Sequence, residues 1–214
     1  MGDPLQLILL IPPLLFALTV HEFSHGFMAL RLGDPTARLQ GRLTLNPMAH
    51  LDPLGSLVFL FPPHIGWAKP VPVDVRYLGH PRRDMMWIAL AGPVSNVLLA
   101  LGFGTLLRAL GAAPIVFESP AAATLVRMVA WSVVLNLGLA AFNMIPIFPL
   151  DGSKVLAGLL SPRLAARYQS FEAVGPFLIL GLVLLGSFSG FSLIGMIVGP
   201  FVSEFGSLFT GGIL

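Results

Sequence analysis

Long apolar runs, each close to the length that crosses a bilayer, constrain this chain more than any other feature. Only 10% of its 214 residues are charged and 56% are hydrophobic, whereas soluble domains carry about 25% charged residues. About 20 apolar residues in a helix span the hydrocarbon core of a membrane. We therefore expect an all-α polytopic membrane protein with about five transmembrane helices. The expected spans cover residues 5–32, 85–110, 121–145, 171–187 and 191–209, with the last two forming one or two spans.

A different kind of sequence separates the first two spans. Residues 36–84 contain seven prolines and many polar residues. The apolar piece at 54–61 is too short to span, so we expect it to be re-entrant or interfacial. Residues 66–75 alternate β-branched residues with prolines, which predicts an edge strand or an extended loop. We expect one membrane-embedded domain over 1–214, with a core at about 5–160 and C-terminal helices at about 166–210.

The basic residues predict the orientation of the chain in a plasma membrane. Arg31 is the first of them, so no basic segment precedes the first apolar run, and we expect no cleaved signal peptide. The positive-inside rule places residues 33–84 and 152–168 in the cytoplasm and the N-terminus outside. The net charge of +2 is too small to suggest nucleic acid as a partner. The supporting residues are Arg31, Arg38, Arg42, Lys69, Arg76, Arg82 and Arg83 near the first loop, and Lys154, Arg163 and Arg167 after the third span.

An HExxH motif, His21-Glu22-Phe23-Ser24-His25, ends the first apolar run. On a helix, its two histidines lie at i and i+4, so both imidazoles project from one face and can bind one metal ion. Glu22 lies beside them, where it can act as a base toward water at the metal. His21 lies roughly 24 Å into the expected helix, in the cytoplasmic half of the bilayer. Ionisable residues at that depth are costly and indicate a functional site.

A catalytic zinc ion usually takes three protein ligands, so a third must complement the two histidines. The chain has no cysteine, which leaves histidine and carboxylate side chains. Asp151 is the best placed, because it follows the third span at the same depth and precedes Gly152, which permits close approach of the backbone. The candidates are Asp151, His50, His64, His80 and Glu172.

Several motifs resemble the site-2 protease family of intramembrane zinc metalloproteases, in its compact prokaryotic branch without a PDZ domain. They are HEFSHG at 21–26, GRLTLNPMAHLDPLGS at 41–56, GWAKPVPV at 66–73, AGPVSN at 91–96 and NMIPIFPLDGSK at 143–154. The resemblance implies one Zn²⁺ ion held by His21, His25 and Asp151, with Glu22 as the general base. It also implies that Asn143 holds the substrate or the oxyanion, although a helix–helix hydrogen bond is the alternative for that residue.

The same resemblance implies a small β hairpin or sheet at the membrane rim near residues 64–77, to which an unwound substrate could add as a strand. A purely structural hairpin is the alternative. Asn46 and His50 are expected to shape their loop rather than to bind zinc. Gly92, Pro93 and Asn96 are expected to form a close-packing contact with the core helices.

The function expected from these features is hydrolysis of a peptide bond in or near a transmembrane segment of another membrane protein, toward the cytoplasmic side. The implied partners are that membrane-protein substrate and the lipid bilayer, and homo-oligomerisation stays open. The alternative is a membrane metal-ion transporter or binding protein that uses the same His/Asp cluster. A carrier would need ligands along a whole path across the membrane, and the outer halves of the expected spans offer almost none.

Overall fold

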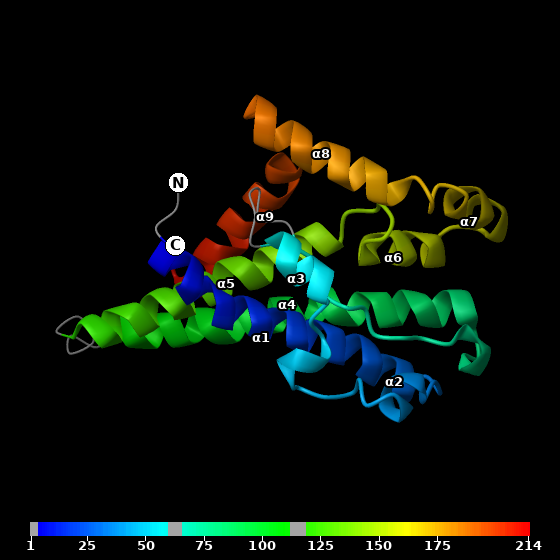
Figure 1. Ribbon diagram of the computed structural model, residues 1–214, viewed down its shortest axis with the longest axis horizontal. Helices are drawn as coiled ribbons and strands as arrows, with labels where there is room; N and C mark the ends of the chain where they lie inside the picture. Colours follow the sequence, from blue (N-terminus) through cyan, green and yellow to red (C-terminus); the bar gives the residue numbers. More distant parts are fainter. Residues whose placement is uncertain (1–3, 60–65, 112–118) are drawn as a thin grey trace.

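The computed structural model describes residues 4–59, 66–111 and 119–214, and these form helices joined by loops (Figure 1). Four of the helices have 18 residues or more, and the rest are shorter. The long helices are α1 (Pro4–Arg31), α4 (Pro81–Gly111), α5 (Pro120–Asn143) and α9 (Leu193–Thr210). The shorter elements are α2 (Thr36–Leu39), η1 (Pro47–Ala49), α3 (Pro53–Phe59), η2 (Val75–Tyr77), α6 (Asp151–Leu159), α7 (Pro162–Gln169) and α8 (Gly175–Ser189).

The four long helices are also the ones apolar enough to cross a membrane. The expected span at 171–187 instead forms α8, which has 15 residues. At 1.5 Å per residue α8 is about 22 Å long, which is less than the roughly 30 Å of a bilayer core. The described residues therefore contain four candidate spans rather than about five, and of the two C-terminal segments only α9 is a candidate span.

Helix α4 lies at the centre of the arrangement and packs against α1, α5, α6 and α9. Figure 1 shows α1, α4 and α5 running alongside one another, while α8 projects away from them. Small residues permit the close approach of α4 and α5: Ala100 packs on Val133 and Leu137, and all three are fully buried. Phe201 and Phe209 of α9 close this cluster. The core thus consists of the surfaces that α4 shares with its neighbours.

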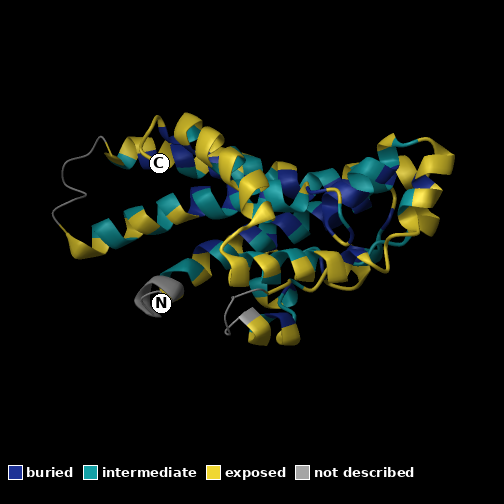
Figure 2. Ribbon diagram, turned by 90° about the horizontal axis from the view of Figure 1, so that it is seen from above, coloured by how far each residue is buried: buried dark blue, intermediate teal, exposed yellow. Residues whose placement is uncertain are grey.

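Large apolar side chains cover the outside of the helices. Leu98 and Leu125 are each 62% exposed, although both lie within candidate spans. In Figure 2 the long helices carry exposed residues, while buried residues gather where helices meet. A water-soluble protein rarely leaves so much contiguous apolar surface uncovered, whereas lipid favours it. The exposed surface therefore agrees with the membrane location predicted from composition.

The predicted β hairpin near residues 64–77 is wrong for residues 66–77. They contain one isolated antiparallel bridge, between Leu51 and Ala68, and no named strand; residues 64 and 65 lie outside the described residues. Pro70 and Pro72 have no N–H group to give to a ladder. The N–H groups of Lys69 and Val71 donate to the His50 carbonyl and the Glu22 carboxylate, respectively. The two N–H groups of this extended segment therefore bind a loop carbonyl and a side chain of α1 instead of a neighbouring strand.

Candidate metal centre

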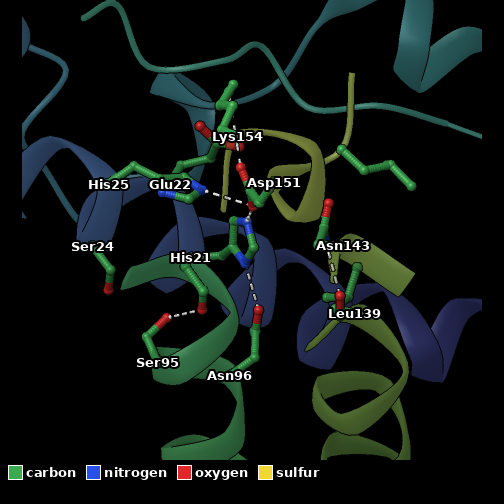
Figure 3. Close-up of polar contacts among 12 residues, drawn as sticks. His21, Glu22, Ser24, His25, Ser95, Asn96, Leu139, Asn143, Asp151 and Lys154 are labelled. Carbon is green, nitrogen blue, oxygen red and sulfur yellow. Dashed lines mark hydrogen bonds and ion pairs between the residues drawn. The ribbon is translucent and has the colours of Figure 1, made fainter. Parts of the chain in front are cut away.

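Three buried side chains from two helices that are far apart in the sequence lie close together (Figure 3). His21 and His25 project from one face of α1, because they are four residues apart on a continuous helix. Asp151 is the first residue of α6. Its Oδ2 lies 3.1 Å from Nε2 of His21 and 3.2 Å from Nε2 of His25. All three residues are at least 91% buried, so the structure joins the HExxH motif to a carboxylate 130 residues away in the chain.

Asp151 reaches the histidines because α6 starts directly against the end of α5. A Cβ atom at Gly152 would lie 2.2 Å from the backbone oxygen of Met144, so only glycine permits this approach. The carboxylate also lies at the N-terminus of α6, where the helix dipole favours negative charge. Its second oxygen, Oδ1, lies 3.9 Å from Nζ of the half-exposed Lys154. The Asp151 carboxylate is therefore held on both sides by positively polarised groups.

Each histidine is also bound through its other ring nitrogen. Nδ1 of His25 lies 2.7 Å from the carbonyl oxygen of Ile88, which can only accept a hydrogen bond. Nδ1 of His21 lies 2.5 Å from Oδ1 of Asn96 on α4. Such contacts orient ligand histidines and leave Nε2 to bind a metal. Asn96 therefore does more than form the close-packing contact predicted from the sequence.

The donor set fits a single zinc ion. Zinc accepts two imidazole nitrogens and one carboxylate oxygen at about 2.0–2.2 Å in tetrahedral geometry, which places the ligand atoms roughly 3.3 Å apart. The distances from Asp151 to the two histidines match this spacing. Helix α4 leaves the space open: a Cβ atom at Gly92 would lie 2.6 Å from Nε2 of His21 and from Cε1 of His25. Gly92 thus permits the rings to lie against α4.

Glu22 is half-buried and lies beside the two histidines on α1. Its Oε2 accepts a hydrogen bond of 3.0 Å from the backbone N–H of Val71. Its other carboxylate oxygen has no hydrogen-bond partner among the residues that the structure describes. The backbone N–H group of Val71 therefore binds one oxygen of the Glu22 carboxylate, and the other oxygen stays available to accept a proton.

Asn143, the last residue of α5, forms no hydrogen bond with His21, His25 or Asp151 in the part of the chain that the structure describes. Its Nδ2 donates to the carbonyl oxygen of Leu139, 3.0 Å away in its own helix (Figure 3). No hydrogen bond joins it to a second helix in the described parts of the chain. An amide nitrogen carries two hydrogens, so one N–H group stays available for another partner.

The other candidates for a third metal ligand lie elsewhere. His50 is buried, and its Nε2 donates to the carbonyl oxygen of Thr44, within the loop that it was expected to shape. His80 and Glu172 are exposed. His64 lies outside the described residues. Among the residues that the structure covers, the one His/Asp/Glu group suited to a metal ion is His21, His25 and Asp151.

Three contributors to the site escaped the sequence analysis: Val71 through its N–H group, Ile88 through its carbonyl, and Asn136, which accepts a hydrogen bond from Asn96. Every residue other than proline has a backbone N–H group and a carbonyl, so residue type could not indicate the contacts of Val71 and Ile88. Asn136 could have been noticed in the sequence, since a polar residue within an apolar span needs a hydrogen-bond partner there.

Comparisons with known proteins agree with this site. Residues 9–186 match the sequence model of the family described as Peptidase family M50. The chain is 39% identical to a Bacillus subtilis (strain 168) protein named "Putative zinc metalloprotease YwhC", over 84% of this chain and 82% of that protein. Two proteins named "Putative zinc metalloprotease Rip2" are also similar to this chain, with 32% identity for the one from Mycolicibacterium smegmatis and 34% identity for the one from Mycobacterium tuberculosis (strain H37Rv).

The mycobacterial matches cover 73% and 70% of this chain but only 59% and 56% of those proteins, which are therefore longer. No solved structure matches the chain.

Proposed function

This chain belongs to peptidase family M50 and is a zinc metalloprotease of the site-2 protease type, and we propose that it cleaves a peptide bond in or near a transmembrane segment of another membrane protein. The observation that carries the proposal is the buried His21–His25–Asp151 group, whose two histidines lie within a candidate span. A hydrolytic site at that depth is reached most directly by a substrate that also lies in the bilayer.

The depth of the site supports a position toward the cytoplasm. His21 lies roughly ten residues before Arg31, the end of α1, which corresponds to about 15 Å along the helix. Arg31 begins the stretch rich in basic residues, and such stretches are retained on the cytoplasmic side. Under this orientation the substrate is cut near the cytoplasmic end of its transmembrane segment, and the N-terminus of the protease lies outside.

His21, His25 and Asp151 would hold the zinc ion, and Glu22 would move the proton. When bound, zinc supplies a Lewis acid that polarises the scissile carbonyl and increases the acidity of water. Glu22 accepts a proton from the attacking water at the oxygen that Val71 leaves unoccupied. The same oxygen then gives this proton to the nitrogen of the leaving amine, so the carboxylate is restored.

Asn143 is assigned to the substrate. With one amide hydrogen bound to the Leu139 carbonyl, the side chain is held at the end of α5, between that helix and the turn that leads to Asp151. Its second N–H group could donate to the substrate carbonyl or to the oxyanion. In this role it binds and orients the peptide and does not itself exchange protons.

A metal-transport function gains no support from the site. A carrier needs successive ligand groups across the bilayer, and residues 4–59, 66–111 and 119–214 contain one such group. Transport also gives no role to Glu22, which carries the proton in hydrolysis.

The proposal is tested with Glu22→Gln, which keeps an oxygen for the Val71 N–H group but cannot accept the proton. The matched control is Glu204→Gln, the same change at an exposed residue of α9. Membrane proteomes of cells that carry each variant or the wild type are compared by mass spectrometry, and zinc content is measured on the purified proteins.

We expect one or more full-length membrane proteins to accumulate with Glu22→Gln only. In wild-type cells their fragments should end within or beside a transmembrane segment. Glu22→Gln should retain zinc. A Glu22→Gln variant that retains zinc and leaves the membrane proteome unchanged would contradict the proposal.

A further inference from the structure

Two asparagines lie fully buried between the apolar helices, next to the metal centre. Asn96 of α4 and Asn136 of α5 are both 0% exposed. Nδ2 of Asn96 donates to Oδ1 of Asn136 at 2.8 Å, and Nδ2 of Asn136 donates to the Ser132 carbonyl at 2.8 Å. Burying an amide without partners costs roughly 1–3 kcal/mol. Their hydrogen bonds offset that cost, but they do not explain why amides stand where apolar residues would pack equally well.

The direction of this chain of hydrogen bonds is set by backbone carbonyls. The Ser132 carbonyl can only accept, so Asn136 must turn its Nδ2 toward it and its Oδ1 toward Asn96. Asn96 then donates to Asn136 and, at 3.3 Å, to the carbonyl of Ala17 on α1. Both contacts orient the Asn96 amide in the same way, with its Oδ1 facing Nδ1 of His21.

One tautomer of His21 satisfies this arrangement. Since Oδ1 of Asn96 has no hydrogen, Nδ1 of His21 must carry one and donate it. Nε2 of the neutral ring then has its lone pair available, and this is the atom that lies 3.1 Å from Asp151. His25 reaches the same state through the carbonyl of Ile88, a backbone group that substitution cannot remove. The state of His21 depends on side chains.

We propose that Asn96 and Asn136 are positioning residues, which hold His21 with Nδ1 protonated and Nε2 directed at the metal. This inference rests on the zinc site of the proposed function. Asn96 makes the contact with the ring, and Asn136 determines which end of the Asn96 amide faces it. Loss of such an outer partner typically weakens metal binding by about 10–100-fold.

The competing explanation is that the two amides only join α1, α4 and α5. In that role, the N–H groups of Asn96 matter, because they reach Ala17 and Asn136. In the positioning role, its oxygen matters. Asn96→Asp separates the two, since aspartate keeps an acceptor for His21 and loses both donors. Asn96→Leu removes acceptor and donors together at similar volume.

The test measures Zn²⁺ affinity by competition with a chromogenic chelator on the purified full-length protein in detergent. It also records ¹⁵N NMR shifts of labelled histidine, which distinguish the two tautomers. The variants are Asn96→Leu, Asn96→Asp and Asn136→Leu. Ser95→Ala is the matched control, because the Ser95 hydroxyl donates to the Gly92 carbonyl next to Asn96 and takes no part in the chain of amides.

We expect Asn96→Leu to weaken zinc binding by about 10–100-fold and to give a mixture of His21 tautomers. Asn96→Asp and Ser95→Ala should stay close to the wild type. Asn136→Leu should lose less zinc affinity than Asn96→Leu. If Asn96→Leu does not fold, Asn136→Leu is compared with the wild type in its place. Equal affinity in Asn96→Leu and the wild type, or an equal loss in Asn96→Leu and Asn96→Asp, would overturn the positioning role alone. A wild-type protein that binds no zinc would instead refute the proposed function on which it rests.

Discussion

Replacement of Gly92 by alanine should remove zinc from the site while leaving the helices in place. The added Cβ would lie 2.6 Å from Nε2 and Cε1 of His21 and from Cε1 of His25. Ordinary contacts of this kind start at about 3.4 Å, so the rings or α4 would have to move by roughly 0.8 Å. Neither ring is free to do so, because His21 is bound to Asn96 and His25 to Ile88 through their other nitrogens.

Two magnitudes decide which effect dominates. Overpacking costs about 1–3 kcal/mol of folding free energy, and alanine recovers about 0.5–1 kcal/mol of helix propensity over glycine. The net loss of stability is therefore modest. A metal site, by contrast, must keep its geometry within about 0.5 Å, and a misplacement near 1 Å can cost about 100-fold in rate. We expect the affinity for zinc and the protease activity of Gly92→Ala to fall far more than its stability.

The matched control is Gly102→Ala, in the same helix, where an added Cβ would have no atom within 4 Å. Zinc affinity is measured by chelator competition, and unfolding of both variants is followed by circular dichroism in detergent. Gly102→Ala should bind zinc as the wild type does. If Gly92→Ala also bound zinc with wild-type affinity, the assignment of the metal to the space between α1 and α4 would be refuted.

Three further outcomes are expected. Gly152→Ala should lose zinc and stability together, because its Cβ would lie 2.2 Å from the Met144 backbone oxygen and would push Asp151 away; a variant with normal zinc content would contradict this. Asp34→Ala should lower stability by at least about 2 kcal/mol, since the buried Asp34 carboxylate accepts hydrogen bonds from Thr36 and from the Asp74 N–H. Thermal unfolding measures that loss, and the zinc affinity of the folded protein should not change. Removal of zinc by a chelator should abolish cleavage of the membrane protein that accumulates with Glu22→Gln. Added Zn²⁺ should restore this cleavage and Mg²⁺ should not, because Mg²⁺ prefers oxygen ligands. Cleavage in the presence of chelator would exclude the zinc mechanism.

The local part of the site could be predicted from the sequence, because it depends on helix periodicity alone. His21 and His25 share a face at spacing i and i+4, and they do so on α1. Asp151 could be chosen from five candidates because depth in a membrane can be counted in residues. In a membrane protein, helix length and the distribution of basic residues predict the depth of each side chain, so residues distant in the sequence can be matched by depth.

At the expected membrane rim, the predicted β hairpin was wrong for residues 66–77. Alternating β-branched residues in 66–75 predicted an edge strand or an extended loop, and the family resemblance implied a hairpin, but strand pairing depends on where each N–H group finds an acceptor. Here Lys69 and Val71 donate to a loop carbonyl and to Glu22, and the intervening prolines have nothing to donate. No local pattern reveals those acceptors, since they belong to distant segments.

The sequence by itself determined that the chain enters a membrane, which helix carries the metal motif, and which family it resembles. Only the tertiary structure decided how the motif becomes a site: Gly92 opens the space, Asn96 and Asn136 orient His21, and Val71 holds Glu22 by one oxygen. The physical reason lies in the range of each interaction. Hydrophobic burial and helix periodicity act along the chain, whereas directional hydrogen bonds and close packing depend on groups that meet only after the helices have packed.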